Sequence, residues 1–144
     1  VHSCLLTAIK EIMKFFVIGK RKENIKPEQF AEHLDLEAKI AIQLFRESSH
    51  NGHIGAQTKL GVCYKLGHGV EKNLIYAFNM FRKSADKGDV KAQTLLGICY
   101  KNGSGVEKNF TTAFELFTKS AEKGDIEAQT QMGICYENGK GDNR

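Results

Sequence analysis

The feature that most constrains this chain is an internal repeat with an offset of 36 residues. The segment from Ala56 to Lys91 aligns with the segment from Ala92 to Glu127, and 23 of the 36 positions are identical. A third copy opens at Ala128 and spans about half a unit. Repeats of 20 to 50 residues are typical of solenoids, in which each unit buries its apolar face by stacking on its neighbours. The repeat therefore predicts a stacked array that presents surfaces rather than catalytic chemistry.

Composition narrows the class of protein further. Hydrophobic residues make up 41% of the chain and charged residues 26%, which is typical of a folded globular domain. The net charge of +4 is mild, and the two signs are interspersed rather than gathered in a basic stripe of the kind that binds nucleic acid. No apolar run reaches the roughly 18 residues that a membrane span needs. We therefore expect neither a nucleic-acid nor a membrane partner.

Each copy predicts two helices joined by a glycine-containing turn. The first, helix A, runs from about Ala56 to Lys65 with apolar residues at helical spacing. The second, helix B, follows Asn73 and carries an apolar stripe that includes Ala77 and Phe81. The alternation of apolar and polar residues that marks a β-strand is absent. We predict an all-α fold, a right-handed α-solenoid of antiparallel helix pairs with a 36-residue period.

The residues before each helix predict how its first turn is capped. Asp89 and Asp125 precede helix A in the second and third copies, as N-caps should. His53 takes that slot in the first copy, and we expect the cap to be lost there. Asn73 and Asn109 are predicted to cap helix B.

A glycine stands inside helix A in every copy, at Gly61, Gly97 and Gly133. Each costs about 1 kcal/mol relative to alanine in a helix interior. Glycine at one slot in three copies indicates a helix that crosses too close to admit a side chain. We expect Ala77 and Ala113 of helix B to be the close neighbours.

The chain before the first full copy shows a weaker form of the same pattern. Its amphipathic start predicts a helix that caps the array, although the end of an upstream domain or an interfacial membrane helix would also fit. Asp35 is a plausible cap for a helix B that precedes the first full copy. The predicted organisation is an N-terminal capping helix with a degenerate first unit (1–34), the helix B of that unit (35–55), two full repeats (56–91 and 92–127) and a truncated repeat, helix A only (128–144).

Three cysteines, Cys63, Cys99 and Cys135, occupy one slot of successive copies. Stacked units lie roughly 10 Å apart, whereas a disulfide needs Cα atoms within about 7 Å. We therefore expect buried free thiols and a reducing compartment such as the cytoplasm. Cys63 and His68 have a spacing that a metal site could use, but only in one copy, so no metal or other cofactor is expected.

The motif A-Q-x-x-L-G-x-x-Y-x-x-G-x-G-V, followed by a spaced A, F, K-S-A and G, closely resembles the Sel-1-like repeat, a relative of the tetratricopeptide repeat. The resemblance covers about residues 36–144. It departs from the family at Asn73 and Asn109, where aspartate is usual. The residues that carry it in the first full copy are Ala56, Leu60, Gly61, Tyr64, Gly67, Gly69, Val70, Ala77, Phe81, Lys83, Ala85 and Gly88.

This resemblance implies an adaptor that scaffolds protein complexes, for example in signalling, and in some proteins the array is joined to a kinase or another catalytic domain. In tetratricopeptide relatives, ligands lie along the concave face, which helix A lines. The implied partner-binding residues are Thr58, Lys59, Val62, Lys65 and Leu66 in the first copy, Thr94, Leu95, Ile98, Lys101 and Asn102 in the second, and Thr130, Gln131, Ile134, Glu137 and Asn138 in the third.

A comparison among the copies supports part of this assignment. Lys59, Leu95 and Gln131 share one slot but differ in chemistry, as expected of positions that contact a ligand. The alternative, that these positions are merely exposed and unconstrained, stays open. So does a purely architectural or regulatory role beside a catalytic domain outside this segment. We expect no enzymatic activity, because no nucleophile, base or metal set converges, and we expect other proteins as partners, with self-association through the open array ends.

Overall fold

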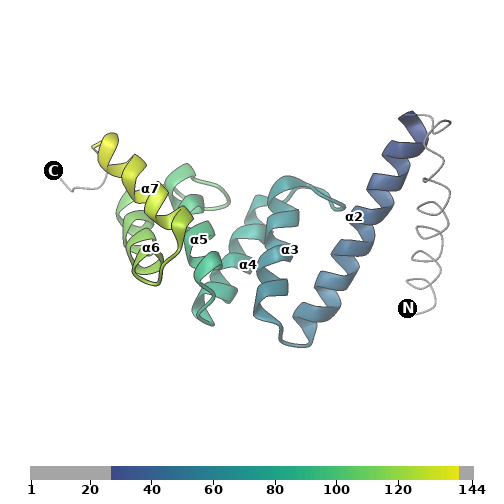
Figure 1. Cartoon of the computed structure of the whole chain (residues 1–144), viewed down its shortest axis with the longest axis horizontal. Coiled ribbons are helices and arrows are strands. Elements are labelled where there is room, and N and C mark those ends of the chain that lie inside the picture. Colours follow the sequence, from purple (N-terminus) through teal and green to yellow (C-terminus); the bar gives the residue numbers. More distant parts are fainter. Residues whose placement is uncertain (1–26, 140–144) are drawn as a thin grey trace.

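The computed structural model describes residues 27–139, and Figure 1 shows them as helices arranged in series along one long axis. No strand occurs within that range, so the fold is all-α, as predicted. The predicted N-terminal capping helix falls outside the described residues. The helices are α2 (Pro27–His50), α3 (Ile54–Leu66), α4 (Leu74–Asp86), α5 (Val90–Asn102), α6 (Phe110–Glu122) and α7 (Ile126–Glu137).

The helices pack in chain order. α3 pairs with α4 and α5 with α6, while α4 also packs on α5 and α6 on α7. In the terms of the repeat, α3, α5 and α7 are the A helices, and α4 and α6 are the B helices. The A helices begin at Ile54, Val90 and Ile126, so that each start lies 36 residues after the one before. Each helix therefore finds its main contacts in its neighbours along the chain, as in a solenoid.

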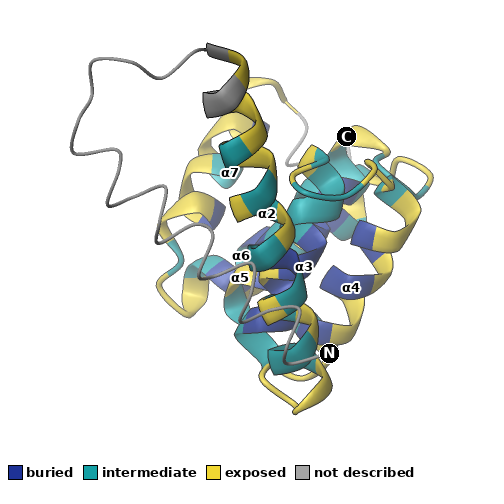
Figure 2. Ribbon diagram, turned by 90° about the vertical axis from the view of Figure 1, so that its right-hand side faces the viewer, coloured by how far each residue is buried: buried dark blue, intermediate teal, exposed yellow. Residues whose placement is uncertain are grey.

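The apolar core is a chain of clusters rather than one centre. Phe81 and Phe117, one from each B helix, have no exposed surface. Phe81 packs with Leu96 and Cys99 of the following A helix, and Phe117 packs with Cys135 in the same way. Figure 2 shows buried segments on the inner sides of α3, α4 and α5. Each unit thus completes its core with the next unit.

The glycines inside the A helices do mark close helix crossings. A Cβ atom at Gly97 would lie 2.6 Å from Cε1 of Phe117, and one at Gly61 would lie 2.7 Å from Cε1 of Phe81. The atoms nearest to Gly97 belong to the ring of Phe117 and not to Ala113, because the phenylalanine ring reaches across the crossing. At Gly133 no atom lies within 4 Å of the same position, since no described helix B follows α7.

The predicted aspartate and asparagine caps of the repeats form. The side chains of Asp89 and Asp125 accept hydrogen bonds from the backbone N–H groups of Ala92 and Ala128, at 3.2 and 2.9 Å. Asn73 and Asn109 cap the B helices in the same manner.

The expected loss of the cap at His53 is wrong. Nδ1 of His53 accepts a hydrogen bond from the N–H of Ala56 at 3.0 Å. A neutral imidazole has one nitrogen that accepts a hydrogen bond. In His53 that nitrogen does what the aspartate oxygen does in the later copies.

The helix boundary expected at Asp35 is also wrong. A single helix, α2, runs from Pro27 to His50 without interruption. No glycine or proline stands between Glu28 and His50 to break it. Asp35 forms an ion pair with Lys39, one turn later, at 2.8 Å instead of capping a new helix.

The close crossing predicts that a glycine-to-leucine substitution changes stability differently in two copies. Gly97→Leu would force a side chain into the fully buried Phe117 ring, so we expect a loss of roughly 1–3 kcal/mol or more. Gly133→Leu adds a side chain in open space and is expected to be neutral or to gain up to about 1 kcal/mol from helix propensity. Thermal and urea unfolding of both variants would test this. Equal melting temperatures for the two would contradict the close crossing.

The cap at His53 predicts that two substitutions at this position differ in their effect on stability. His53→Ala leaves the N–H of Ala56 without its acceptor, and we expect a loss of about 1 kcal/mol. His53→Asp keeps an acceptor and adds a negative charge at the helix N-terminus, so it should be at least as stable as the parent. Urea unfolding monitored by circular dichroism measures both. A His53→Ala variant as stable as the parent would show that the bond contributes nothing.

Candidate functional site

Of the fifteen residues predicted to contact a partner, fourteen lie on the A helices α3, α5 and α7, and Asn138 directly follows α7. Side-chain hydrogen bonds join each A helix to the next one or to its cap. Thirteen of the fifteen are exposed or half-buried. We call these thirteen, without Thr130, the A surface: Lys59, Val62, Lys65, Leu66, Leu95, Ile98, Lys101, Asn102, Gln131, Ile134, Glu137 and Asn138.

The other two predicted residues, Thr58 and Thr94, are structural. Their exposed fractions are 4% and 2%, which leaves no room for a partner. The hydroxyl of Thr94 donates to Oδ2 of Asp125 at 2.7 Å, and Thr58 donates to Asp89 in the same way. Each aspartate therefore caps its own helix and also accepts a bond from the preceding unit. Both positions hold threonine because the hydroxyl group joins one unit to the next.

An apolar centre lies in the middle of the A surface. Val62 and Leu95 are half-buried against the cluster around Phe81. Ile98 is half-buried against the cluster around Phe117. These side chains rest on the core with one side and remain accessible on the other. A partner that covers them would extend the core rather than form a separate one.

The lysines at one repeated slot have different surroundings. Nζ of Lys101 donates to Oε1 of Gln131 at 2.6 Å, whereas Lys65 has Leu95 at the equivalent place, which offers no acceptor. Burial raises the pKa of the Cys99 thiol, and the nearby positive charge of Lys65 partly offsets that rise. No described residue forms a hydrogen bond or ion pair with the Lys65 ammonium. Lys65 is therefore available to a partner, while Lys101 is already engaged.

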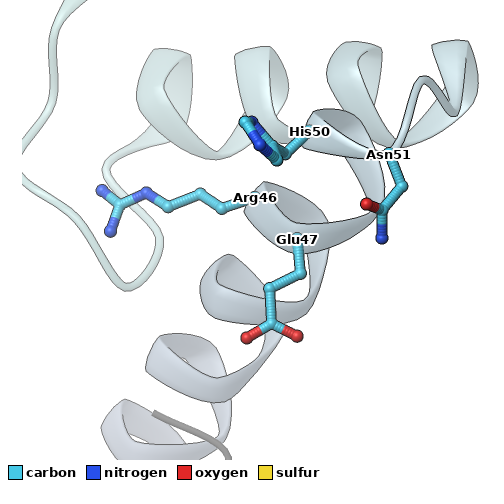
Figure 3. A pocket seen from close by; sticks show the side chains of 4 residues that line it. All are labelled: Arg46, Glu47, His50 and Asn51. Carbon is cyan, nitrogen blue, oxygen red and sulfur yellow. The ribbon is translucent and has the colours of Figure 1, made fainter.

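Two open hollows lie near the end of α2, outside the predicted residues. One, of about 500 Å³, is lined by Arg46, Glu47, His50 and Asn51. Figure 3 shows these side chains spread along the last turns of α2 and the residue after it, without converging on one point. The hollow therefore lacks the convergent polar groups of a small-molecule site.

The second hollow, of about 470 Å³, adjoins an aromatic pair that the repeat pattern does not reveal. Arg46 donates to the hydroxyl of Tyr64 at 2.7 Å, and the Tyr64 ring lies 4.3 Å from the ring of Tyr76. In the next copy the equivalent tyrosine, Tyr100, packs edge-on against Phe78 of the preceding helix B. The slot equivalent to Phe78 before Tyr64 holds Ile42, which has no ring. The missing ring at Ile42 is the sequence feature that could have indicated the different packing of Tyr64.

No described feature points to catalysis or to a metal. Within residues 27–139 no three or more histidine, cysteine, aspartate and glutamate side chains come together as metal ligands. Burial raises the pKa of Cys63, partly offset by Lys59, and a raised pKa disfavours the thiolate that acts as a nucleophile. In the same part of the chain, no helix has both the length and the apolar character needed to cross a membrane.

The repeat family follows from these units. The family model for the Sel1 repeat matches residues 54–89, 90–125 and 126–144, which is more than half of the chain. The chain belongs to the Sel1 repeat family. Each match begins at the first residue of an A helix. Sel1 repeat proteins generally serve as scaffolds for protein–protein interaction and are generally non-catalytic.

Solved structures show the same architecture. A Sel1 repeat protein from Oxalobacter formigenes is 33% identical with a TM-score of 0.61, and the match covers 66% of this chain and 71% of that one. The protein c5321, a protective antigen of uropathogenic Escherichia coli with an SLR fold, is 31% identical with a TM-score of 0.67. That match covers 72% of this chain but only 22% of the antigen's length. No functionally curated protein matches the chain significantly.

The link between units predicts that Thr94 matters more than its exposed equivalent. Thr94→Val keeps the shape but removes a buried bond to a carboxylate, and we expect a loss of about 1–3 kcal/mol. Thr130→Val changes an exposed hydroxyl whose hydrogen bond goes to the Ile126 carbonyl of its own helix, so the change in the free energy of unfolding should stay within about 0.5 kcal/mol. Urea unfolding measures both. Equal losses would argue against the link between units.

Proposed function

We propose that this chain is a non-catalytic adaptor that binds a peptide or a helix of another protein on its A surface. The observation that carries the proposal is the single slot that holds Lys59, Leu95 and Gln131. On either side of that slot the copies agree, with threonine before it and leucine or methionine followed by glycine after it. The chain thus varies at a slot on the A surface while it preserves the neighbouring slots.

Burial supports this interpretation over simple lack of constraint. Leu95 is half-buried on the core, and Gln131 is held between Lys101 and Glu127 by hydrogen bonds of 2.6 and 2.8 Å. Unconstrained surface positions more often carry side chains that extend freely into water. In the second and third copies this slot therefore has a defined and different local chemistry.

The chemistry of the A surface favours a partner with an apolar anchor and acidic groups. Leu95 and Ile98 offer the apolar side chains that an anchor would cover. Lys59 and Lys65 lie on the neighbouring helix α3 and supply positive charge. In protein interfaces, desolvated apolar anchors provide most of the affinity, and peripheral charges mainly accelerate association.

A substitution taken from the chain itself tests the proposal. Leu95→Gln introduces the residue that the third copy has at the same slot, so the fold should tolerate it. We expect proteins captured from the source cells by the full chain to bind the variant at least tenfold more weakly. Calorimetry or surface plasmon resonance with the captured protein would measure this. Lys65→Glu should mainly slow association, and more so at low salt.

Ile75→Gln is the matched control. Ile75 is 65% exposed on α4, so the change also removes an exposed apolar side chain but from a B helix. The control should bind as the parent does. If Leu95→Gln binds as the parent does while Ile75→Gln binds weakly, the partner sits on the B helices. If both bind as the parent does, the array has an architectural role and the A surface is not the site.

A further inference from the structure

The A helices change sign along the array. Every charged residue of α3 and α5 is a lysine, whereas both charged residues of α7 are glutamates. The change occurs at equivalent slots. Lys65 and Lys101 share a slot with Glu137, and Lys91 shares a slot with Glu127. The helices therefore repeat their core residues while reversing their surface charge.

The slot that holds Lys91 in α5 and Glu127 in α7 lies beside the A surface. Oε1 of Glu127 accepts a bond from Nε2 of Gln131, one turn later, at 2.8 Å. By the same spacing Lys91 lies one turn before Leu95 on α5, and it is exposed. Lys91 and Glu127 thus lie next to Leu95 and Gln131, which belong to the A surface.

The point where the sign changes is already bridged within the protein. Lys101 donates to Gln131, and Gln131 donates to Glu127, so this lysine and this glutamate belong to one network. Beyond that network no described residue forms a hydrogen bond or ion pair with the charged groups of Lys59, Lys65 or Glu137. Lysines without a described ion pair therefore lie at the α3 end of the A surface, and a glutamate without a described ion pair lies at the α7 end.

We propose that the partner is a bipolar segment, with acidic residues over α3, an apolar residue on Leu95 and Ile98, and a basic residue over α7. This inference rests on the proposed function, since it assumes that the A surface is the binding face. Opposite charges attract across an interface and like charges are penalised, so the polarity also selects one direction for the segment along the array.

The spacing of the helices sets the length of the segment. Each step from one A helix to the next is at least one helix spacing of about 8–10 Å, so α3 and α7 are separated by at least roughly 16–20 Å. An extended chain covers this in about five or six residues at roughly 3.3 Å each. A helix covers it in about 11–13 residues at 1.5 Å each. Random peptides of about 16 residues are therefore long enough for either form.

The first test is a selection from such a peptide library displayed on phage, with the full chain as target. Peptides that also bind the Leu95→Gln variant are removed, so that the remaining peptides depend on the A surface. We expect acidic residues toward one end of these peptides, lysine or arginine toward the other, and an apolar residue between them.

The second test exchanges charges. Glu127→Lys combined with Glu137→Lys gives α7 the residues that α5 carries at the same slots, so the fold should accept them. A selected peptide should bind this variant about fivefold more weakly at low ionic strength, and the difference should shrink with added salt. The same peptide with its basic residues changed to glutamate should instead bind the variant better than the parent.

Glu115→Lys combined with Glu122→Lys is the control, because it changes the net charge equally but on the exposed side of α6. It should leave the affinity for the selected peptide nearly unchanged. The bipolar partner would be overturned if the Leu95-dependent peptides showed no separation of acidic and basic residues. It would also be overturned if those peptides bound both double variants as they bind the parent. In either case the proposed function would still stand. A selection that yields no Leu95-dependent peptide would overturn both.

Discussion

The contact between a helix A glycine and a helix B phenylalanine is the constraint on which the rest of the array depends. Phe117 lies where a side chain at Gly97 would stand, so the two helices can pack at this distance only without a Cβ atom. The glycine costs about 1 kcal/mol of helix propensity, and full burial of the ring returns roughly 1.5–3 kcal/mol. The same phenylalanine then packs against the next A helix. One contact therefore sets both the helix pair and the stacking of pairs.

A second contact aligns the A helices with one another. Asp89 and Asp125 each cap a helix and accept a hydroxyl from the preceding unit. Because the bond always joins the same two slots, equivalent residues of successive units come to lie in register. Differences among the copies, such as Lys59 against Leu95, thereby become a pattern along one surface. The surface on which we place the partner is a product of this alignment.

Local features of the fold could be predicted because they depend on residues close in the chain. The aspartate and asparagine caps, the helix pairs and the buried phenylalanines all follow from spacing within one unit. The wrong predictions involved choices that spacing does not reveal. Histidine can accept the capping bond through Nδ1, so His53 did not lose the cap. Asp35 found Lys39 one turn later, and without a glycine or proline nearby the helix continued through it.

The sequence by itself determined that this protein is an all-α stack of helix pairs, because identical residues at one spacing require identical local packing. The tertiary structure decided which surface residues are available. Thr58 looked like a ligand contact and is buried against the cap of a helix 31 residues away. Lys101 is engaged by Gln131, whereas for Lys65, at the same slot, the residue equivalent to Gln131 is a leucine, which offers no acceptor. The physical reason is that these side chains meet partners in the next unit, about 30 residues along the chain, and only the folded stack brings those residues into contact.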